Sequence, residues 1–241
     1  MDTPINQPTN QLVTILVALW RAGDFLEKKL ENLEQQTIFD DCNIVLLNCQ
    51  NHDNEADIYA DFLKRDNVTE IRYNKHINLY PTWNDGIKNT ESEFVMNSNA
   101  DDMLHPEYIE VCSDWLKTHP DFACVSTGVL LTHYPNQVYP KWEWQGRLPF
   151  DHYPNSTAGP CPMWRRELHD KYGYFGDYRV IGDARLWEKW HAGEERFGLI
   201  QRDMVLYYAH HASLERRVDE KGREFRTLDL MESAKWSEDK R

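Results

Sequence analysis

The first half of the chain alternates continuous apolar runs with amphipathic segments, and this alternation constrains the fold more than any other feature. The runs LVTILVALW (12–20) and CNIVLLNC (42–49) predict strands that are buried on both faces. Between them, behind the candidate helix cap Asp24, three leucines recur at the spacing of one helix face: Leu26, Leu30 and Leu33. Strands that alternate with helices in this way are typical of βα units around a mostly parallel sheet.

The pattern continues along the chain and predicts one compact α/β domain. A chain of 241 residues with 41% apolar residues has enough apolar surface for such a core. The further strands are expected at 69–74, 92–98, 122–133 and 204–211, and the further helices at 55–65, 80–90, 105–119, 165–175 and 183–193.

Composition excludes several classes of protein. The net charge of −13, from 40 acidic against 27 basic residues, argues against a nucleic-acid-binding surface. The five cysteines are scattered without CxxC spacing, so neither a disulfide framework nor a zinc site is expected. The apolar run near the N-terminus is too short to span a bilayer and is wrongly flanked for a signal peptide, so we expect a cytoplasmic protein.

Two adjacent acids, Asp101 and Asp102, follow the predicted strand 92–98. Ligands of parallel sheets gather at the carboxyl ends of the strands, and adjacent carboxylates repel unless a positive partner is near. A divalent cation with hard oxygen ligands is one such partner. The alternatives are that one of the acids caps the helix that begins near Pro106, or that both are solvated turn residues.

A long segment, Tyr134–Pro162, is rich in proline and aromatic residues and has little periodicity. Loops of this length in compact domains are usually functional or disordered, and the aromatic residues argue against disorder. Substrate binding, an oligomer contact and aromatic packing over a sheet edge remain open for this loop.

Five blocks of the chain resemble, in order, the motifs of the family 2 glycosyltransferases, which have the GT-A fold of the nucleotide-diphospho-sugar transferases. The blocks are VTILVALWRAGDFLEKKLENLEQQT, IVLLNCQNHDNE, NLYPTWNDGIKNTESEFVMNSNADDMLHPEYIE, PMWRRELHDKYGYFGDYRVIGDARLWEKW and YYAHHASLERR. The resemblance implies a single Rossmann-like GT-A domain over residues 1–217, with a mixed, mainly parallel central sheet flanked by helices. Its nucleotide-binding part is expected at about 12–110, its acceptor-binding part at about 111–217, and a charged tail at 218–241.

The family's DxD motif falls on Asn99-Ala100-Asp101, so the first acid of the motif is absent here. By this correspondence Asp101 is the ligand of a Mn²⁺ or Mg²⁺ ion, while Asn99 offers hydrogen bonds but no charge. His210 matches the family's histidine and is a second candidate metal ligand. Tyr208 replaces the arginine of the same motif, so the contact to the donor phosphates falls to His211 or Arg216.

The resemblance also assigns the catalytic base. Asp183 stands at the position of the family's base aspartate, just ahead of the amphipathic segment DARLWEKWHAG. An aspartate before a helix is also a common N-cap, and one residue can have both roles. The family usually has a glutamate before this aspartate, and Gly182 replaces it.

The expected contacts to the nucleotide donor depart from the family at two positions. Asn48 stands where the family has its uracil-facing acid, and Trp83 replaces the arginine that precedes Asn84. A uridine donor stays open beside guanosine, cytidine and thymidine donors, and Trp83 is alternatively a core residue. The full donor-binding set implied is Ala18, Leu19, Trp20, Asn48, Trp83, Asn84, Asn99, Ala100 and Asp101.

The acceptor is expected to contact aromatic rings, because the CH faces of sugars pack on them. The residues implied are Trp142 and Trp144 of the aromatic loop, with Asp183 and Trp187. The implied partners are a nucleotide sugar and a glycan or glycoconjugate acceptor, while a homo-oligomer and a peripheral contact with a membrane stay open.

The implied reaction is inverting transfer of a hexosyl or deoxyhexosyl group from a nucleotide-diphosphate sugar to an acceptor hydroxyl. Two other functions compete with it. A degenerate relative would bind a nucleotide sugar or a glycan without turnover, since the first acid and the charged base contacts are missing. A nucleotidyltransferase would also place paired acids at strand ends, but the blocks around Asp183 and His210 fit it poorly.

Overall fold

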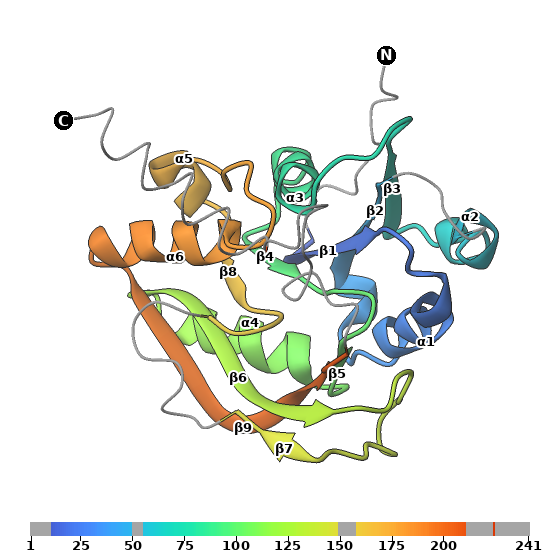
Figure 1. Cartoon of the computed structure of the whole chain (residues 1–241). Helices are drawn as coiled ribbons and strands as arrows, with labels where there is room; N and C mark the ends of the chain where they lie inside the picture. The colour runs from blue at the N-terminus through green and yellow to red at the C-terminus, as the bar shows by residue number, and fades with distance from the viewer. Residues whose placement is uncertain (1–10, 50–54, 149–157, 211–223, 225–241) are drawn as a thin grey trace.

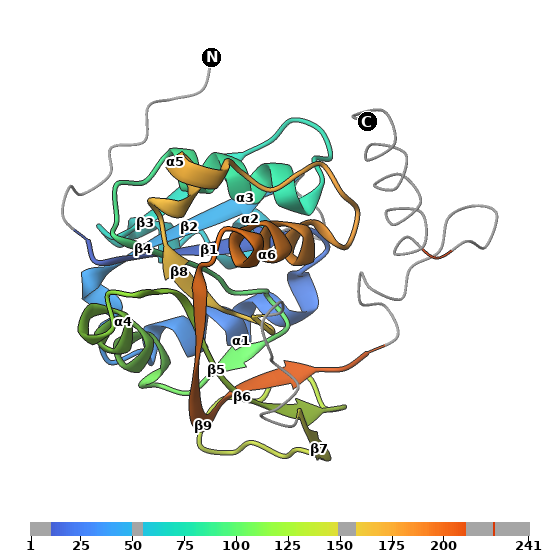
Figure 2. The same cartoon turned by 90° about the vertical axis from the view of Figure 1, so that its left-hand side faces the viewer.

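The computed structural model of the chain describes residues 11–49, 55–148, 158–210 and 224. The described strands form one mixed sheet with helices on both faces (Figures 1 and 2). The prediction of an α/β fold with a mainly parallel central sheet flanked by helices is confirmed.

The sheet is built on four parallel strands, β3 (Val68–Arg72), β2 (Cys42–Asn48), β1 (Val13–Leu19) and β4 (Phe94–Asn97), in that spatial order. Every residue of β2 is buried, which is why this strand is an unbroken apolar run apart from its ends. Because the four strands are parallel, the residues that follow their carboxyl ends gather at one edge of the sheet.

The sheet continues from β4 through five more strands of mixed direction. These are β8 (Met163–Arg165), β6 (Phe122–Thr132), β9 (Arg196–Tyr208), β5 (Met103–Leu104) and, paired with β6, β7 (Gly146–Arg147). The register of β6 and β9 shifts around Gly128, and such irregularities bend paired strands. In Figure 1 these two long strands curve away from the parallel strands and carry β5 and β7 with them.

Two groups of helices cover the two faces. One face carries α1 (Gly23–Glu34), α2 (Glu55–Ile58) and α4 (Tyr108–Thr118), with the short 3₁₀ turns η1 (Phe39–Asp41) and η2 (Phe62–Lys64). The other face carries α3 (Leu79–Lys88), α5 (Leu168–Tyr172) and α6 (Gly182–Ala192), whose aromatic residues form a second core.

Helix α3 packs unusually close to the sheet at Gly86. A Cβ atom at this position would lie 2.5 Å from Cδ2 of Leu16 in β1. A larger residue here would require the Leu16 side chain to shift, so the glycine favours the close packing of α3 on β1.

Several predicted elements differ from those observed. The expected helix 55–65 is broken into α2 and η2, and Asp24 lies inside the first turn of α1, whose N-cap is Ala22 without a side-chain cap. The helix expected at 165–175 is limited to α5, and Arg165 instead ends the strand β8, which was not predicted and which pairs with β4 and β6. The last strand begins at Arg196 rather than near 204.

The five cysteines are free and buried, as expected of small core residues. No helix among the described residues is long and apolar enough to cross a membrane. His211, Arg216 and the tail 218–241 fall outside the described residues, apart from Glu224. The assignment of nucleotide binding to about residues 12–110 and of acceptor binding to about residues 111–217 stays a prediction.

Candidate active site

The acid pair lies in the loop between β4 and β5, at the carboxyl edge of the parallel strands. Asp102 is buried, and its carboxylate accepts hydrogen bonds from the backbone N–H of Tyr208 at 3.3 Å and from Nδ2 of Asn99 at 3.1 Å. Burial, and then the charge of Asp101, raise the pKa of Asp102 to about 8. Asp102 is therefore an internal carboxyl group that holds the loop to the end of β9, and it does not cap α4, whose N-cap is Glu107.

The positive partner of the pair is Lys29, which is fully buried beneath it. Its ammonium Nζ donates a hydrogen bond to the backbone carbonyl of Asp102 at 2.7 Å. Burial lowers the pKa of this lysine, while the charges of Asp102 and Asp101 oppose that effect. Sequence analysis missed this residue. Its spacing could have revealed it, because Lys29 stands three residues after Leu26 and therefore on the buried face of α1.

The two predicted metal ligands meet in space. Nε2 of His210 lies 3.0 Å from Oδ2 of Asp101, although the two residues are 109 positions apart. The imidazole of His210 stacks on Tyr208, with ring centroids 4.7 Å apart, which fixes its orientation. The end of β9 thus carries a ligand-type side chain to the acid loop.

These two side chains form an incomplete set of metal ligands. Within the described residues, no group of three or more His, Cys, Asp or Glu side chains is placed to hold a metal ion. One carboxylate and one imidazole fit a Mn²⁺ or Mg²⁺ ion whose remaining positions are filled by phosphate oxygens and water. The donor set fits an ion that arrives with a diphosphate.

Asp183 lies in the first turn of α6. Its Oδ1 accepts hydrogen bonds from the backbone N–H of Ala184 at 2.7 Å and from the hydroxyl of Tyr80 at 3.0 Å. The N-cap of the helix is Ile181, so the alternative that Asp183 is the N-cap is wrong. The N-terminal end of a helix stabilises a carboxylate, and Tyr80 at the start of α3 ties this residue to the carboxyl edge of the parallel strands.

Three of the predicted donor contacts are engaged in the protein interior. Asn48 is buried and donates hydrogen bonds to the hydroxyl of Tyr59 and to Glu70. Trp83 is only 4% exposed, so it is a core residue and does not offer its ring to a nucleobase. Asn84 forms two hydrogen bonds with the backbone of Phe175, at 2.8 and 3.0 Å.

The end of β1 offers groups that the sequence analysis missed. Ala18 and Trp20 are partly buried and Leu19 is buried, as expected for the end of a strand. The Arg21 guanidinium lies over the ring of Trp20, 5.0 Å from its centroid, and His76 lies 4.9 Å away on the same ring. Arg21 has a φ of 55°, so its backbone is left-handed, which no pattern of side chains reveals.

The predicted acceptor residues do not form one surface. Trp187 is 3% exposed and packs against Trp164 and Trp190, so its ring lies in the aromatic core, and its assignment to acceptor binding stays a prediction that this burial does not support. Trp142 is partly buried and packs against Met103, Leu130 and Leu206 of β5, β6 and β9. Trp144 is 53% exposed and is therefore the most accessible of the three tryptophans in the set.

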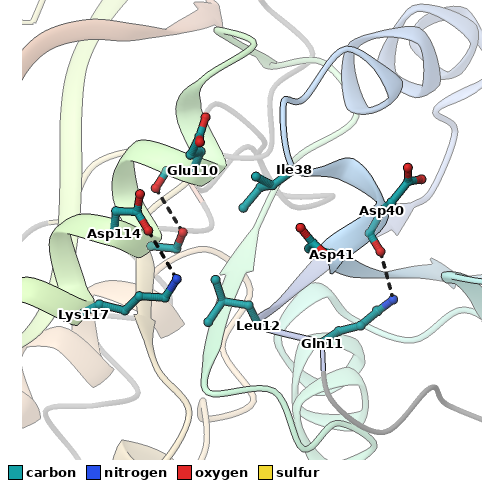
Figure 3. Close-up of a pocket in the computed structure, with 9 residues that line it drawn as sticks. Gln11, Leu12, Ile38, Asp40, Asp41, Glu110, Asp114 and Lys117 are labelled. Atoms are coloured by element: carbon teal, nitrogen blue, oxygen red, sulfur yellow. Dashed lines mark hydrogen bonds and ion pairs between the residues drawn. The ribbon is translucent and has the colours of Figure 1, made fainter.

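A hollow of about 320 Å³ lies at the opposite edge of the sheet (Figure 3). Its walls are formed by the residues before β1 and β2 and by one face of α4: Gln11, Leu12, Ile38, Asp40, Asp41, Glu110, Ser113, Asp114 and Lys117. The side chain of Lys117 is paired with Asp114 at 3.3 Å. This hollow lies at the amino ends of the parallel strands and is no part of the candidate site.

Comparison with known proteins identifies the family. The family model for glycosyl transferase family 2 matches residues 14–173, which is more than half of the chain. The chain belongs to glycosyl transferase family 2. A Bacillus subtilis (strain 168) protein described as "Putative glycosyltransferase EpsH" is 29% identical over 134 residues, which are 56% of this chain and 35% of that protein.

Solved structures of similar fold are glycosyltransferases as well. The S. aureus protein TarS (residues 1–349, in complex with UDP-GlcNAc) superimposes with a TM-score of 0.71 at 13% identity, over 87% of this chain and 62% of that one. The mannosyltransferase PcManGT from Pyrobaculum calidifontis, in complex with GDP-Man and Mn²⁺, gives 0.65 at 16% identity, over 89% and 61%. The GT-A fold is therefore confirmed, and the chain spans less than two thirds of the length of these relatives.

Proposed function

We propose that the protein transfers a sugar from a nucleotide-diphosphate sugar to a hydroxyl group of a glycan or glycoconjugate acceptor. The observation that carries this proposal is the contact between Asp101 and His210, which brings two ligand-type side chains together at the carboxyl edge of the parallel strands. Membership in the family and the nucleotide-sugar complexes of TarS and PcManGT support it.

The donor diphosphate is proposed to bind beside Asp101 and His210. A divalent cation held there would stabilise the negative charge that forms on the leaving diphosphate. Asp101 would supply a carboxylate oxygen and His210 an imidazole nitrogen to that ion, and Asn99 and Asp102 keep the loop in place. Arg21, at the end of β1, adds a positive charge near the donor.

Asp183 is proposed to be the general base. As the acceptor oxygen forms its bond to the anomeric carbon, its proton passes to the Asp183 carboxylate, while the bond from that carbon to the diphosphate breaks and its electron pair leaves with the phosphate oxygen. A single displacement of this kind inverts the anomeric configuration. The sugar is proposed to be a hexose or deoxyhexose, and exposed Trp144 to contact the acceptor.

Turnover of nucleotide sugars tests this proposal. UDP- and GDP-sugars with Mn²⁺ or Mg²⁺ should be hydrolysed slowly or transferred to acceptors by the wild type. Asp183→Asn should lower kcat by at least about 100-fold because a general base contributes that much, with little change in donor binding. Asp101→Ala should raise the metal concentration needed for half-maximal rate.

A second candidate is a protein of the same fold that binds a nucleotide sugar without turnover. The burial of Trp83 and the internal hydrogen bonds of Asn48 favour it, because both positions are charged base contacts in the family. Nucleotide binding without any turnover, in the wild type and in Asp183→Asn alike, would establish this alternative and reject the enzyme.

A further inference from the structure

Tyr80 links the first turn of α3 to the first turn of α6. Its hydroxyl donates to Oδ1 of Asp183 at 3.0 Å and to the backbone carbonyl of Val180. Because the hydroxyl has one proton, these two acceptors share it. The same Oδ1 accepts the backbone N–H of Ala184, so the Tyr80 hydroxyl and this N–H both help to orient the carboxylate of Asp183.

The ring of Tyr80 is held rigidly. It is 2% exposed, packs edge-on against Trp83 with centroids 5.4 Å apart, and stacks on Phe175 at 5.7 Å. Burial, and then the charge of Asp183, raise the pKa of Tyr80 far above its usual value, so the hydroxyl keeps its proton. The packing of Trp83 and Phe175 thus keeps the Tyr80 hydroxyl in position to donate to Asp183.

The same ring explains the glycine that precedes Asp183. A Cβ atom on Gly182 would lie 2.6 to 2.7 Å from three ring atoms of Tyr80, and those atoms belong to a ring that cannot turn away. A larger residue at position 182 is therefore excluded while Tyr80 is present. Tyr80 and Gly182 are therefore sterically coupled, because the Tyr80 ring occupies the space beside Gly182 at the start of α6.

We propose that Tyr80 is the positioning residue of Asp183 and that, with Gly182, it replaces the acid that other members of the family have before this aspartate. This inference rests on the proposed role of Asp183 as the base. A neighbouring glutamate would oppose ionisation of the aspartate through like charge, whereas a hydroxyl donor stabilises the ionised form. The replacement keeps Asp183 ionised, and ready to accept a proton, down to lower pH.

Direct titration of Asp183 tests the hydrogen bond without any need for turnover. Protein labelled with ¹³C at the aspartate carboxyl carbons is titrated by NMR, and Asp183→Asn identifies the signal. In Tyr80→Phe, which keeps the ring, the midpoint of Asp183 should rise by about one pH unit, since a hydrogen bond to a charged group is lost. An unchanged midpoint would overturn the proposal.

The matched control is Tyr172→Phe. The hydroxyl of Tyr172 also donates to a carboxylate, Glu195 at 2.8 Å, and to the backbone carbonyl of Gly193, just after the far end of α6. This variant loses the same kind of hydrogen bond but should leave the Asp183 midpoint unchanged. A shift as large as that of Tyr80→Phe would show a general effect of losing a tyrosine hydroxyl and would reject a special role for Tyr80.

The steric half of the proposal has its own test. Gly182→Ala should lower the melting temperature in the wild type by several degrees and much less in a Tyr80→Ala background, where the ring is gone. Gly146→Ala, whose new Cβ would make only ordinary contacts of 3.4 Å or more with Leu131, serves as the control. An equal cost of Gly182→Ala in both backgrounds would contradict the pairing of the two residues.

Kinetics separates this inference from the proposed function. If Asp183 is the base, Tyr80→Phe should move the acidic limb of the kcat profile to higher pH by the same amount as the NMR midpoint, with the KM for the donor unchanged. If Asp183→Asn leaves turnover intact, the proposed role of Asp183 fails, while the titration still decides whether Tyr80 stabilises its carboxylate.

Discussion

Asn99 acquires its role from a neighbour three residues away. Its amide donates a hydrogen bond to the carboxyl group of the buried Asp102. The ammonium of Lys29 donates to the backbone carbonyl of the same residue. An acid at position 99 would place a third carboxylate beside Asp101 and Asp102, with one buried lysine to balance them. The asparagine is thus the residue type that lets the loop fold before any cation is present.

Replacement of Asn99 by Asp tests this reading. Without divalent ions the variant should be less stable than the wild type by about 2 kcal/mol, because the amide hydrogen bond to the buried Asp102 is lost and a further acid stands close to Asp101. Mn²⁺ should raise its melting temperature more than that of the wild type, since the added acid is a further oxygen ligand. The measurement is a thermal melt with and without Mn²⁺; equal stability of the two proteins without metal would contradict the role of Asn99.

At the scale of elements, the short strand β8 and helix α5 are held together by a buried histidine. Nε2 of His169 accepts the indole N–H of Trp164 at 2.9 Å, so the proton of the neutral ring lies on Nδ1, which donates to the carbonyl of Gly173 at 3.1 Å. Burial lowers the pKa of His169 to about 4. A second proton would have to displace the indole from Nε2.

The pH dependence of stability follows from this lowered pKa. The unfolded chain binds a proton near the ordinary value of 6.5, whereas the folded protein does so only near about 4. Stability from this group is therefore complete above pH 6.5 and falls by about 3 kcal/mol as the pH drops to about 4.

His169→Gln is the matching variant, because its amide can accept the indole N–H and donate to Gly173. Denaturant melts at several pH values should show a smaller loss of stability between pH 6.5 and 4 in the variant than in the wild type. Parallel curves for the two proteins would show that His169 does not titrate in this way.

At the scale of the whole molecule, the candidate site lies where the parallel strands β3, β2, β1 and β4 meet the mixed half of the sheet that contains β6 and β9. The parallel strands supply the acid loop and the start of α3, while β9 returns across the curved half of the sheet and delivers His210 to Asp101. Because the described residues supply only two ligand-type side chains, the cation and the donor diphosphate should complete each other's site.

This predicts synergy between nucleotide and metal. UDP or GDP together with Mn²⁺ should raise the melting temperature by about 5 °C or more at concentrations well above the dissociation constant. Either component alone should give a much smaller shift. A thermal-shift screen with UDP, GDP, CMP and dTDP checks this, and Asp101→Ala should abolish the extra shift. Equal shifts with and without Mn²⁺ would reject a shared site.

The parts of the site that could be predicted are those set by a short stretch of sequence, whereas contacts between distant segments could not be predicted. The acid loop, Asp183 and His210 stand in blocks whose residue order resembles the family, so the sequence placed them correctly at the ends of elements. Trp83 and Trp187, predicted as ligand contacts, lie in the core, and the sequence could not show this because an indole on a helix looks the same whether its helix face meets the core or a cleft. Lys29 was missed because its burial depends on a loop 73 residues away.

The sequence by itself determined the alternation of strands and helices, because buried strands and amphipathic helices each require their own periodicity of apolar residues. It also determined which residue types stand at the carboxyl ends of the strands. Only the tertiary structure decided that β8 is a strand, that Lys29 lies beneath the acid pair and that Tyr80 fills the space beside Gly182. Each of these depends on segments distant in the chain, whose packing no local pattern encodes.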